Sequence, residues 1–238
     1  EAGVTYCCHR PSRTLREEPV TKVLLTLATL AHPSWDMARP SQEAVCHMLA
    51  TILEDADLVR AAVLAASVYG SPVHEGVGLR AFEEVRADVR DRVTYRLGEA
   101  YERLRIWLEQ YASEEVLPID HFLSRLFGEL ISQPGFGLYK DVQAGAQVGA
   151  VVESARKFRR AVADVLEREQ EPVGKAYVEM VQEGVVSGFY AVEWADPPDA
   201  VLIAPAHTFL LRNRSYAHLL WLDVGSTAWH RRIHQPLT

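Results

Sequence analysis

The chain has 238 residues, of which 48% are hydrophobic and 24% charged, and its formal net charge is -7. This composition is that of an ordinary globular protein that can bury one large core or two smaller ones, which argues against an intrinsically disordered chain. The net negative charge excludes a protein whose whole surface binds nucleic acid, because phosphate binding depends on Lys and Arg. Any contact with DNA must therefore come from a local patch.

The cysteines and the hydropathy pattern indicate an intracellular protein. Three cysteines, of which Cys7 and Cys8 are adjacent, cannot form a disulfide framework. The sequence has no signal-peptide pattern and no apolar run long enough to span a bilayer. We therefore expect a cytoplasmic protein with no membrane attachment. Because it begins at Glu1 and ends at Thr238 without a closing signal, we also expect a piece of a longer chain.

Apolar residues repeat every three or four positions through most of the chain, which predicts helices. Pro19 lies near the start of the first of these, and Ser41 is the expected N-cap of the second. The pattern from Val85 to Tyr111 continues without interruption and predicts one long helix. The other helices are expected at about residues 56–69, from Pro118 to about residue 133, at 143–168 with Gly145 outside the helix, and at 177–186.

Two short apolar runs near the end of the chain predict buried strands. They are Val201-Leu202-Ile203-Ala204 and Leu219-Leu220-Trp221-Leu222-Asp223-Val224. Two buried strands after a long helical stretch predict a mainly α fold, in which a helical domain is joined to part of an α/β domain.

Several common catalytic signatures are absent from the sequence. It contains no G-x-x-x-x-G-K-[ST] motif and no Asp-Glu dipeptide, so the loop that cradles phosphates and the usual acidic pair that holds Mg²⁺ are missing. The zinc motif H-E-x-x-H, paired C-x-x-C motifs and the G-x-S-x-G nucleophile motif are also missing. We therefore expect that this chain alone binds no ATP, Mg²⁺ or other cofactor and catalyses no complete motor reaction.

A zinc site is conceivable where Cys7-Cys8-His9 would meet Cys46-His47, because both residue types bind zinc. Adjacent cysteines rarely reach one tetrahedral ion together. The favoured interpretation of Cys7 and Cys8 is two small apolar residues at the end of a strand.

A cluster of four cations lies in the helix expected at residues 143–168. Arg156, Lys157, Arg159 and Arg160 flank Phe158, which we expect to be buried. The cluster is either a solvated helix face, which is the favoured interpretation, or a face that contacts phosphates.

The segment at residues 204–214 lies between the two expected strands. A polar loop at the carboxyl end of a buried strand is where open α/β sheets bind ligands, although a polar cover over a sheet edge has the same composition. Residues 201–238 hold four arginines and four histidines against one acid, Asp223. This is the positive end of an acidic chain.

Several segments of the sequence are similar to segments of one protein family. They are SRTLREEPVTKVLLTL (12–27), HFLSRLFGE (121–129), QPGFG (133–137), residues 152–159, APAHTFLLRNR (204–214), LWLDVGS (220–226) and QPLT (235–238). The chain resembles superfamily 1 DNA helicases of the UvrD/Rep/PcrA type, and specifically a divergent bacterial branch.

The resemblance implies a domain layout. Residues 1–35 would be part of the second RecA-like motor domain, residues 36–199 a helical insertion domain, and residues 200–238 the return to the motor domain. The longer protein would be an ATP-dependent DNA helicase that acts in DNA repair or recombination and translocates on single-stranded DNA. Its ATP and Mg²⁺ would be held mainly by the first motor domain, which lies outside this chain and would be its intramolecular partner.

The resemblance also implies roles for individual residues. His207, Thr208 and Asn213 would couple the nucleotide to DNA in the loop that corresponds to the fifth helicase motif. Of that motif only His207-Thr208 is kept, and Arg212-Asn213-Arg214 replaces the Gly-Lys or Gly-Leu-Glu run of the standard helicases. DNA contacts would come from five arginines: Arg156, Arg159, Arg160, Arg212 and Arg214.

The sequence leaves two alternatives to a motor fragment. One is a non-catalytic helical interaction module of a DNA repair or recombination complex, and the other is a free-standing helical scaffold. A phosphate loop encoded upstream of Glu1 would favour the motor, a stop codon there would favour the module, and a start codon just before Glu1 would favour the scaffold.

Overall fold

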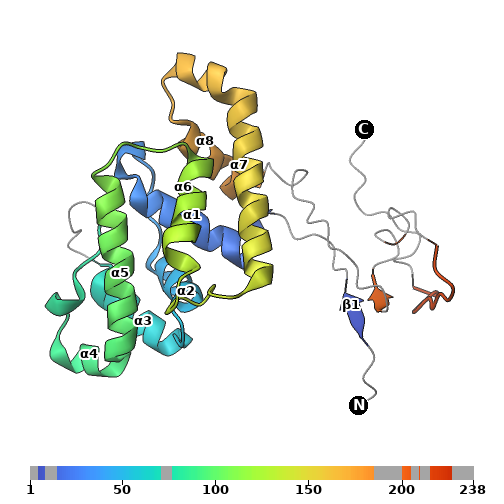
Figure 1. Ribbon diagram of the computed structural model, residues 1–238, viewed down its shortest axis with the longest axis horizontal. Helices are drawn as coiled ribbons and strands as arrows, with labels where there is room; N and C mark the ends of the chain where they lie inside the picture. The colour runs from blue at the N-terminus through green and yellow to red at the C-terminus, as the bar shows by residue number, and fades with distance from the viewer. Residues whose placement is uncertain are drawn as a thin grey trace. The chain divides into compact units, whose positions relative to one another are not determined.

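The computed structural model describes residues 5–8, 15–70, 77–184, 200–204, 209 and 215–226. Contacts within the chain divide it into two compact units. Residues 14–192 form a helical unit, and residues 1–13 together with 193–238 form the second unit. The predicted mainly α fold is confirmed, because helices make up nearly all of the described secondary structure (Figure 1).

The helical unit is built from α-helices linked by short turns. Its elements in chain order are the 3₁₀-helix η1 (Leu15–Glu17), α1 (Pro19–Ala31), the 3₁₀-helix η2 (Pro33–Trp35), α2 (Gln42–Ile52), α3 (Leu58–Val68), the 3₁₀-helix η3 (Phe82–Glu84), α4 (Ala87–Val93), α5 (Tyr95–Ala112), α6 (Ile119–Leu126), the π-helical turn η4 (Phe127–Ile131), α7 (Val142–Glu169) and α8 (Val173–Glu183).

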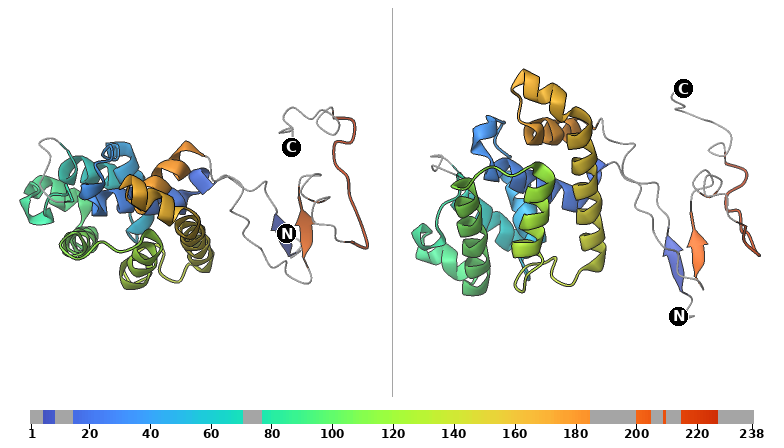
Figure 2. Two further views of the ribbon diagram at one scale, coloured as in Figure 1. Left: turned by 90° about the horizontal axis from the view of Figure 1, so that it is seen from above. Right: turned by 45° about the horizontal axis from the view of Figure 1, so that its top comes forward.

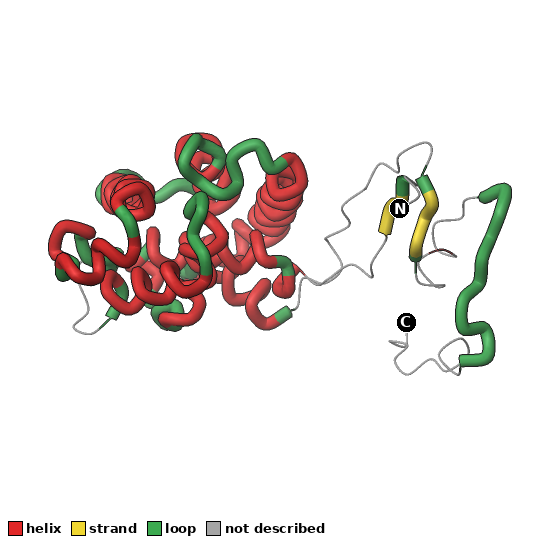
Figure 3. Tube along the Cα trace, turned by 90° about the horizontal axis from the view of Figure 1, so that it is seen from below, coloured by secondary structure: helices red, strands yellow, loops and turns green. Residues whose placement is uncertain are grey.

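The helical unit has two layers. Helices α5, α6 and α7 lie next to one another in one layer and are seen end-on in Figure 3, while α1, α2 and α3 cross behind them. One hydrophobic core runs between the layers and takes residues from every helix, so each helix is held by the apolar stripe that its sequence predicts. None of the helices in the described ranges 15–70 and 77–184 combines the length and the apolar character that a bilayer-spanning segment requires.

The predicted helix starts are confirmed at α1 and α2. Pro19 is the first residue of α1, where its missing N–H does not disturb the helix. Ser41 caps α2, because its Oγ accepts a hydrogen bond from the Ala44 N–H at 3.1 Å. Asp57 caps α3 in the same way, through the Arg60 N–H at 2.8 Å.

The prediction of one long helix from Val85 to Tyr111 is wrong. The chain forms α4, turns at Thr94 and continues as α5. Thr94 has φ +78° and ψ 148°, a conformation that ends one helix and starts the next. The apolar repeat continues across the break, since Val89, Val93 and Leu97 are all buried. Periodicity therefore could not reveal the change in helix direction.

Thr94 is expected to be a strained position. A β-branched residue at positive φ costs on the order of 1–3 kcal/mol, whereas glycine tolerates this conformation. The Thr94 side chain makes no capping hydrogen bond to α5, so its removal loses little. We expect Thr94→Gly to raise the free energy of unfolding by about 1 kcal/mol in urea titrations followed by circular dichroism. Thr94→Ala keeps the Cβ atom and should give no such gain; an equal gain from alanine would contradict the strain.

The helix expected at residues 143–168 is confirmed as α7, but the placement of Gly145 outside it is wrong. The Asp141 carboxylate accepts the Ala144 N–H at 2.9 Å, and the Asp141 carbonyl accepts the Gly145 N–H at 2.9 Å. This cap places Gly145 in the first turn, where the helix propensity of glycine matters least. After Gln170, at φ +59°, the chain folds back and α8 packs against α7 (Figure 2).

The second unit contains a small parallel sheet. Strand β1 (Tyr6–Cys8) pairs with β2 (Val201–Ile203), with Tyr6 opposite Val201 and Cys8 opposite Ile203. The strand predicted at residues 201–204 is therefore confirmed, and so is the strand setting of Cys7 and Cys8. Its predicted burial is wrong, because Val201 and Ile203 are about half exposed.

The second predicted strand, at residues 219–224, is also wrong. The segment has no regular secondary structure, and Leu220 is 91% and Leu222 80% exposed. An apolar run becomes a strand only when a neighbouring strand satisfies its backbone hydrogen bonds, and none of the described strands pairs with this segment.

The helical unit begins before residue 36, where the predicted insertion domain starts. Residues 14–35 belong to the helical unit, whereas the family resemblance implies a place in the motor domain for them. The reason is the burial of α1, whose Leu24, Leu27 and Ala28 are completely buried in contact with the other helices. The helical unit ends at residue 192.

Candidate nucleic-acid interface

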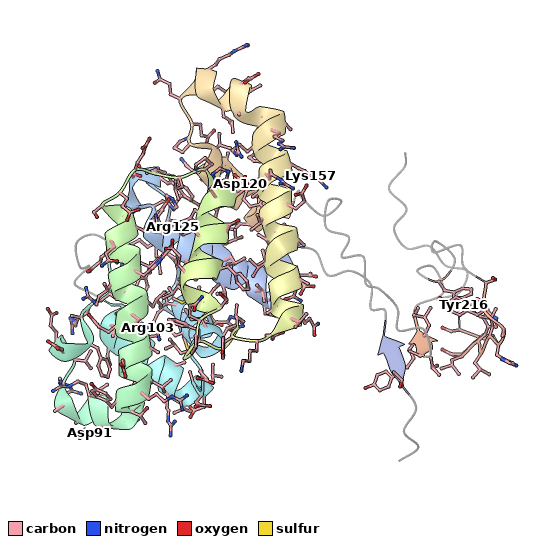
Figure 4. All side chains as sticks on the ribbon, viewed as in Figure 1. Asp91, Arg103, Asp120, Arg125, Lys157 and Tyr216 are labelled. Atoms are coloured by element: carbon pink, nitrogen blue, oxygen red, sulfur yellow. The ribbon has the colours of Figure 1, made fainter. Side chains whose placement is uncertain are left out.

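The predicted cationic cluster lies in the middle of α7. Arg156, Lys157 and Arg160 are exposed, and Figure 4 shows Lys157 on the outer side of α7. Glu153, one turn earlier, pairs with Arg156 and lies 3.8 Å from the Lys157 Nζ. Arg160 makes no ion pair with any described residue. The three cations are thus opposed by one carboxylate, which leaves a net positive helix face.

Arg159 differs from the other cations of the cluster, because it is committed to α6. Its Nε donates to Asp120 Oδ1 and its Nη2 to Asp120 Oδ2, both at 2.8 Å. This two-bond geometry joins the middle of α7 to the first turn of α6. Asp120 is 2% exposed, whereas the Arg159 side chain is 31% exposed. The sequence predicted a DNA contact for Arg159, and the observed geometry favours a structural role.

The charge state of Asp120 depends on this pair. Burial alone would raise the pKa of the Asp120 carboxyl, but the hydrogen bonds and the positive charge of Arg159 outweigh burial and hold that pKa below its usual value. In return, the carboxylate of Asp120 raises the pKa of Arg159. Both groups are therefore charged at neutral pH, and the pair adds no net charge to the helix face.

The packing of α7 on α8 fixes which side of α7 faces outward. Phe158 lies on the inner side with its ring centroid 5.6 Å from that of Tyr177 on α8. The Tyr177 hydroxyl donates to the Val151 carbonyl of α7 at 3.3 Å. Phe158 is partly buried rather than fully buried as predicted. This packing holds the exposed cations on a rigid helix rather than on a loop.

A buried histidine is the other titratable group that stands out. His32 is 2% exposed, and its Nδ1 lies 2.8 Å from the Ala28 carbonyl, so Nδ1 must carry the proton. Its Nε2 then accepts a hydrogen bond from the Tyr111 hydroxyl at 2.9 Å, and that hydroxyl accepts the Leu117 N–H at 3.1 Å. Burial lowers the pKa of His32 to about 4, against the raising effect of the Ala28 hydrogen bond.

The surroundings of His32 indicate that it supports the fold. Its ring stacks on Trp35 with centroids 3.9 Å apart and meets the edge of Phe122 at 4.8 Å. Gly174 of α8 lies so close to the Trp35 ring that a Cβ atom there would clash. With both ring nitrogens satisfied and no open space beside the ring, His32 has no access to a substrate.

The remaining predicted site residues cannot be placed. His207, Thr208, Arg212, Asn213 and Arg214 lie outside the described residues. The hypothetical zinc ligand His9 also lies outside them, and the described part of the chain contains no group of three or more His, Cys, Asp or Glu side chains suited to a metal ion.

A second group of cations has no signature in the sequence. Arg16, Lys22 and His47 come from three elements and line one hollow in the surface of the helical unit. No local pattern joins residues that are far apart in the chain, so only the fold brings them together.

Comparison with known proteins gives no match: neither a protein-family model, nor a curated protein, nor a solved structure is significantly similar to this chain.

Proposed function

We propose that this chain is part of an ATP-dependent DNA translocase of the UvrD/Rep/PcrA type, acting in the cytoplasm in DNA repair or recombination. In this proposal the helical unit is the insertion of the second motor domain, and the outer face of α7 contacts single-stranded DNA. ATP and Mg²⁺ would be bound mainly by the first motor domain, which is not part of this sequence.

The observation that carries the proposal is the pairing of β1 with β2. These strands are parallel and adjacent, yet the whole helical unit lies between them in the chain. Neighbouring parallel strands are usually joined by a single crossover helix. A crossover of this size is what a domain inserted into an α/β sheet produces.

The character of the small sheet supports the same reading. Parallel sheets are stable when both faces are covered, because their strands are apolar on both sides. Here Tyr6 is 68%, Val201 53% and Ile203 51% exposed, and the apolar segment at residues 219–224 is also open to solvent. These surfaces are suited to burial against further strands and helices of a larger α/β domain.

The charge on α7 supports the DNA contact. Affinity for single-stranded DNA comes largely from Lys and Arg side chains that displace counterions from phosphates. Arg156, Lys157 and Arg160 give one rigid face with a charge excess in an otherwise acidic protein. Because the protein as a whole is negatively charged, any DNA contact must come from a local basic patch, and this helix face is such a patch.

The DNA contact is tested by replacing Arg156, Lys157 and Arg160 together with glutamine. We expect weak, salt-sensitive binding of a fluorescent oligodeoxynucleotide by the parent chain, measured by anisotropy at several salt concentrations. The log-log slope should become shallower by about 2 in the triple variant, since each phosphate contact with a single strand contributes roughly -0.7.

A matched control removes three exposed cations elsewhere in the helical unit, by changing Arg86, Arg92 and Lys140 to glutamine. This variant has the same net charge as the test variant and should keep most of the parent's slope. Equal losses in the two variants would mean that only net charge matters. An undetectable interaction of the parent at low salt would instead favour a non-catalytic interaction module.

A further inference from the structure

A hollow of about 230 Å³ opens in the surface of the helical unit where four elements meet. It lies between η1, α1, α2 and the end of α8, and its lining includes Arg16, Lys22, Leu25, His47 and Gln182. Sites for drug-sized ligands occupy roughly 300–1,000 Å³, so this hollow suits a smaller ligand.

The lining of the hollow is basic. Arg16, Lys22 and His47 belong to it, and none of its described lining residues is acidic. No ion pair joins these three side chains to any described residue, whereas Arg60, Arg96, Arg105, Arg125 and Arg159 all have carboxylate partners. Glu43, one turn before His47 on α2, is not part of the lining. Among the described residues, these cations therefore have no carboxylate partner.

The hydrogen-bonding groups favour an anion. The Thr26 hydroxyl already donates to the Lys22 carbonyl at 2.8 Å, so the open donors are the Arg16 guanidinium, the Lys22 ammonium and the Gln182 amide. Leu25, which is 5% exposed, adds an apolar surface to the lining, and apolar surroundings strengthen charge interactions.

We infer that this hollow binds a phosphate dianion, either free or as a terminal phosphate monoester. Donor-bearing side chains that line the hollow from three elements suit a tetrahedral group with several oxygens better than a planar carboxylate. The two permanent cations, Arg16 and Lys22, balance the charge of a dianion, and the guanidinium fork of Arg16 can take two oxygens at once. This site is separate in its residues from the α7 face and does not depend on the proposed DNA contact.

The inference is tested by titrating inorganic phosphate into the ¹⁵N-labelled chain and following amide shifts by NMR. We expect saturable one-site binding in the millimolar range, with the shifts concentrated at residues of the hollow. The double variant Arg16→Gln/Lys22→Gln should lose at least tenfold in affinity. Because both side chains are exposed, this variant should keep the parent's unfolding curve.

The matched control is Arg156→Gln/Lys157→Gln, which removes the same charge from α7. It should bind phosphate as the parent does, whether or not α7 binds DNA. The phosphate site and the DNA contact are therefore tested independently of each other. Equal losses in the two double variants, or no saturable binding by the parent, would overturn the inference.

Two short oligodeoxynucleotides identify the source of the phosphate. One carries a 5′-phosphate, and the other has the same sequence without it. Competition with inorganic phosphate by the phosphorylated oligonucleotide alone would assign the site to a terminal monoester, and competition by neither would assign it to free phosphate. Competition by both would show that the hollow binds internal phosphodiesters, which would overturn the assignment to a dianion.

Discussion

Replacing Arg159 with methionine is expected to lower the free energy of unfolding by about 3 kcal/mol at pH 7. Methionine keeps much of the packing of the arginine stem but leaves the carboxylate of Asp120, which is 2% exposed, without its two hydrogen bonds. Removing one partner of a buried ion pair costs roughly 3–5 kcal/mol, because the other charge stays buried. Urea denaturation followed by circular dichroism measures the change.

The opposite substitution serves as the comparison. Asp120→Asn leaves Arg159 unpaired, but its side chain is 31% exposed and water can solvate the guanidinium. The expected loss is smaller, about 1–2 kcal/mol. Equal losses for the two variants would contradict the asymmetric burial, and a loss below about 1 kcal/mol for Arg159→Met would mean that the pair behaves like a surface salt bridge.

The loss in the Arg159→Met variant should also depend on pH. In the parent, the pKa of Asp120 is lowered, so the stability from its charged form is present above pH ~4 and is lost as pH falls through the folded pKa. In the variant, burial without Arg159 raises this pKa above that of the unfolded chain. The variant therefore loses stability as pH rises above about 4. The difference in free energy of unfolding between the parent and the variant should be larger at pH 7 than at pH 4.

Acidification to pH 4 is expected to remove about 3 kcal/mol of stability through His32. Its pKa is about 4 in the folded protein, whereas an unfolded histidine has a pKa near 6.5. Between these values the unfolded chain binds a proton that the folded chain excludes. The contribution of neutral His32 to the free energy of unfolding should therefore be fully present above about pH 6.5. It should fall by roughly 1.4 kcal/mol for each pH unit below that value, until about pH 4.

His32→Gln isolates this effect from the titration of the carboxylates. The variant should be less stable than the parent at pH 7, because it loses the bonds to Ala28 and Tyr111. Its stability should change much less between pH 6.5 and pH 4.5. Parallel stability curves for the parent and the variant over this range would show that His32 is protonated in the folded state.

The helices were predictable from the sequence because each buries one stripe against a shared core. Capping at Ser41 and the turn at Pro118 also followed from local chemistry. The break at Thr94 was not predictable, since the apolar period continues through it. The strand predicted at residues 219–224 failed for a related reason, because an apolar run does not reveal whether a partner strand is present.

The candidate sites were predictable only in part. Adjacent cations on α7 can be read from the sequence, but the commitment of Arg159 to Asp120 cannot, because the two residues are 39 positions apart. The bond between His32 and Tyr111 joins residues 79 positions apart. The hollow at Arg16, Lys22 and His47 depends in the same way on how α1, α2 and α8 pack. Local sequence patterns do not indicate which residues far apart in the chain will be in contact.

The contact between η1 and α8 has a consequence for the order of folding. These elements are the first and last of the helical unit, and Arg16 lies beside Gly184 at the end of α8. Closing β1 on β2 while the intervening chain of about 190 residues is disordered would carry a large entropic cost. Once the helices have folded, the ends of that chain are held together, and the loop to be closed is roughly tenfold shorter. By the logarithmic dependence on loop length, this reduces the closure cost by about 2 kcal/mol. The helical unit should therefore form first and promote the pairing of the strands that flank it.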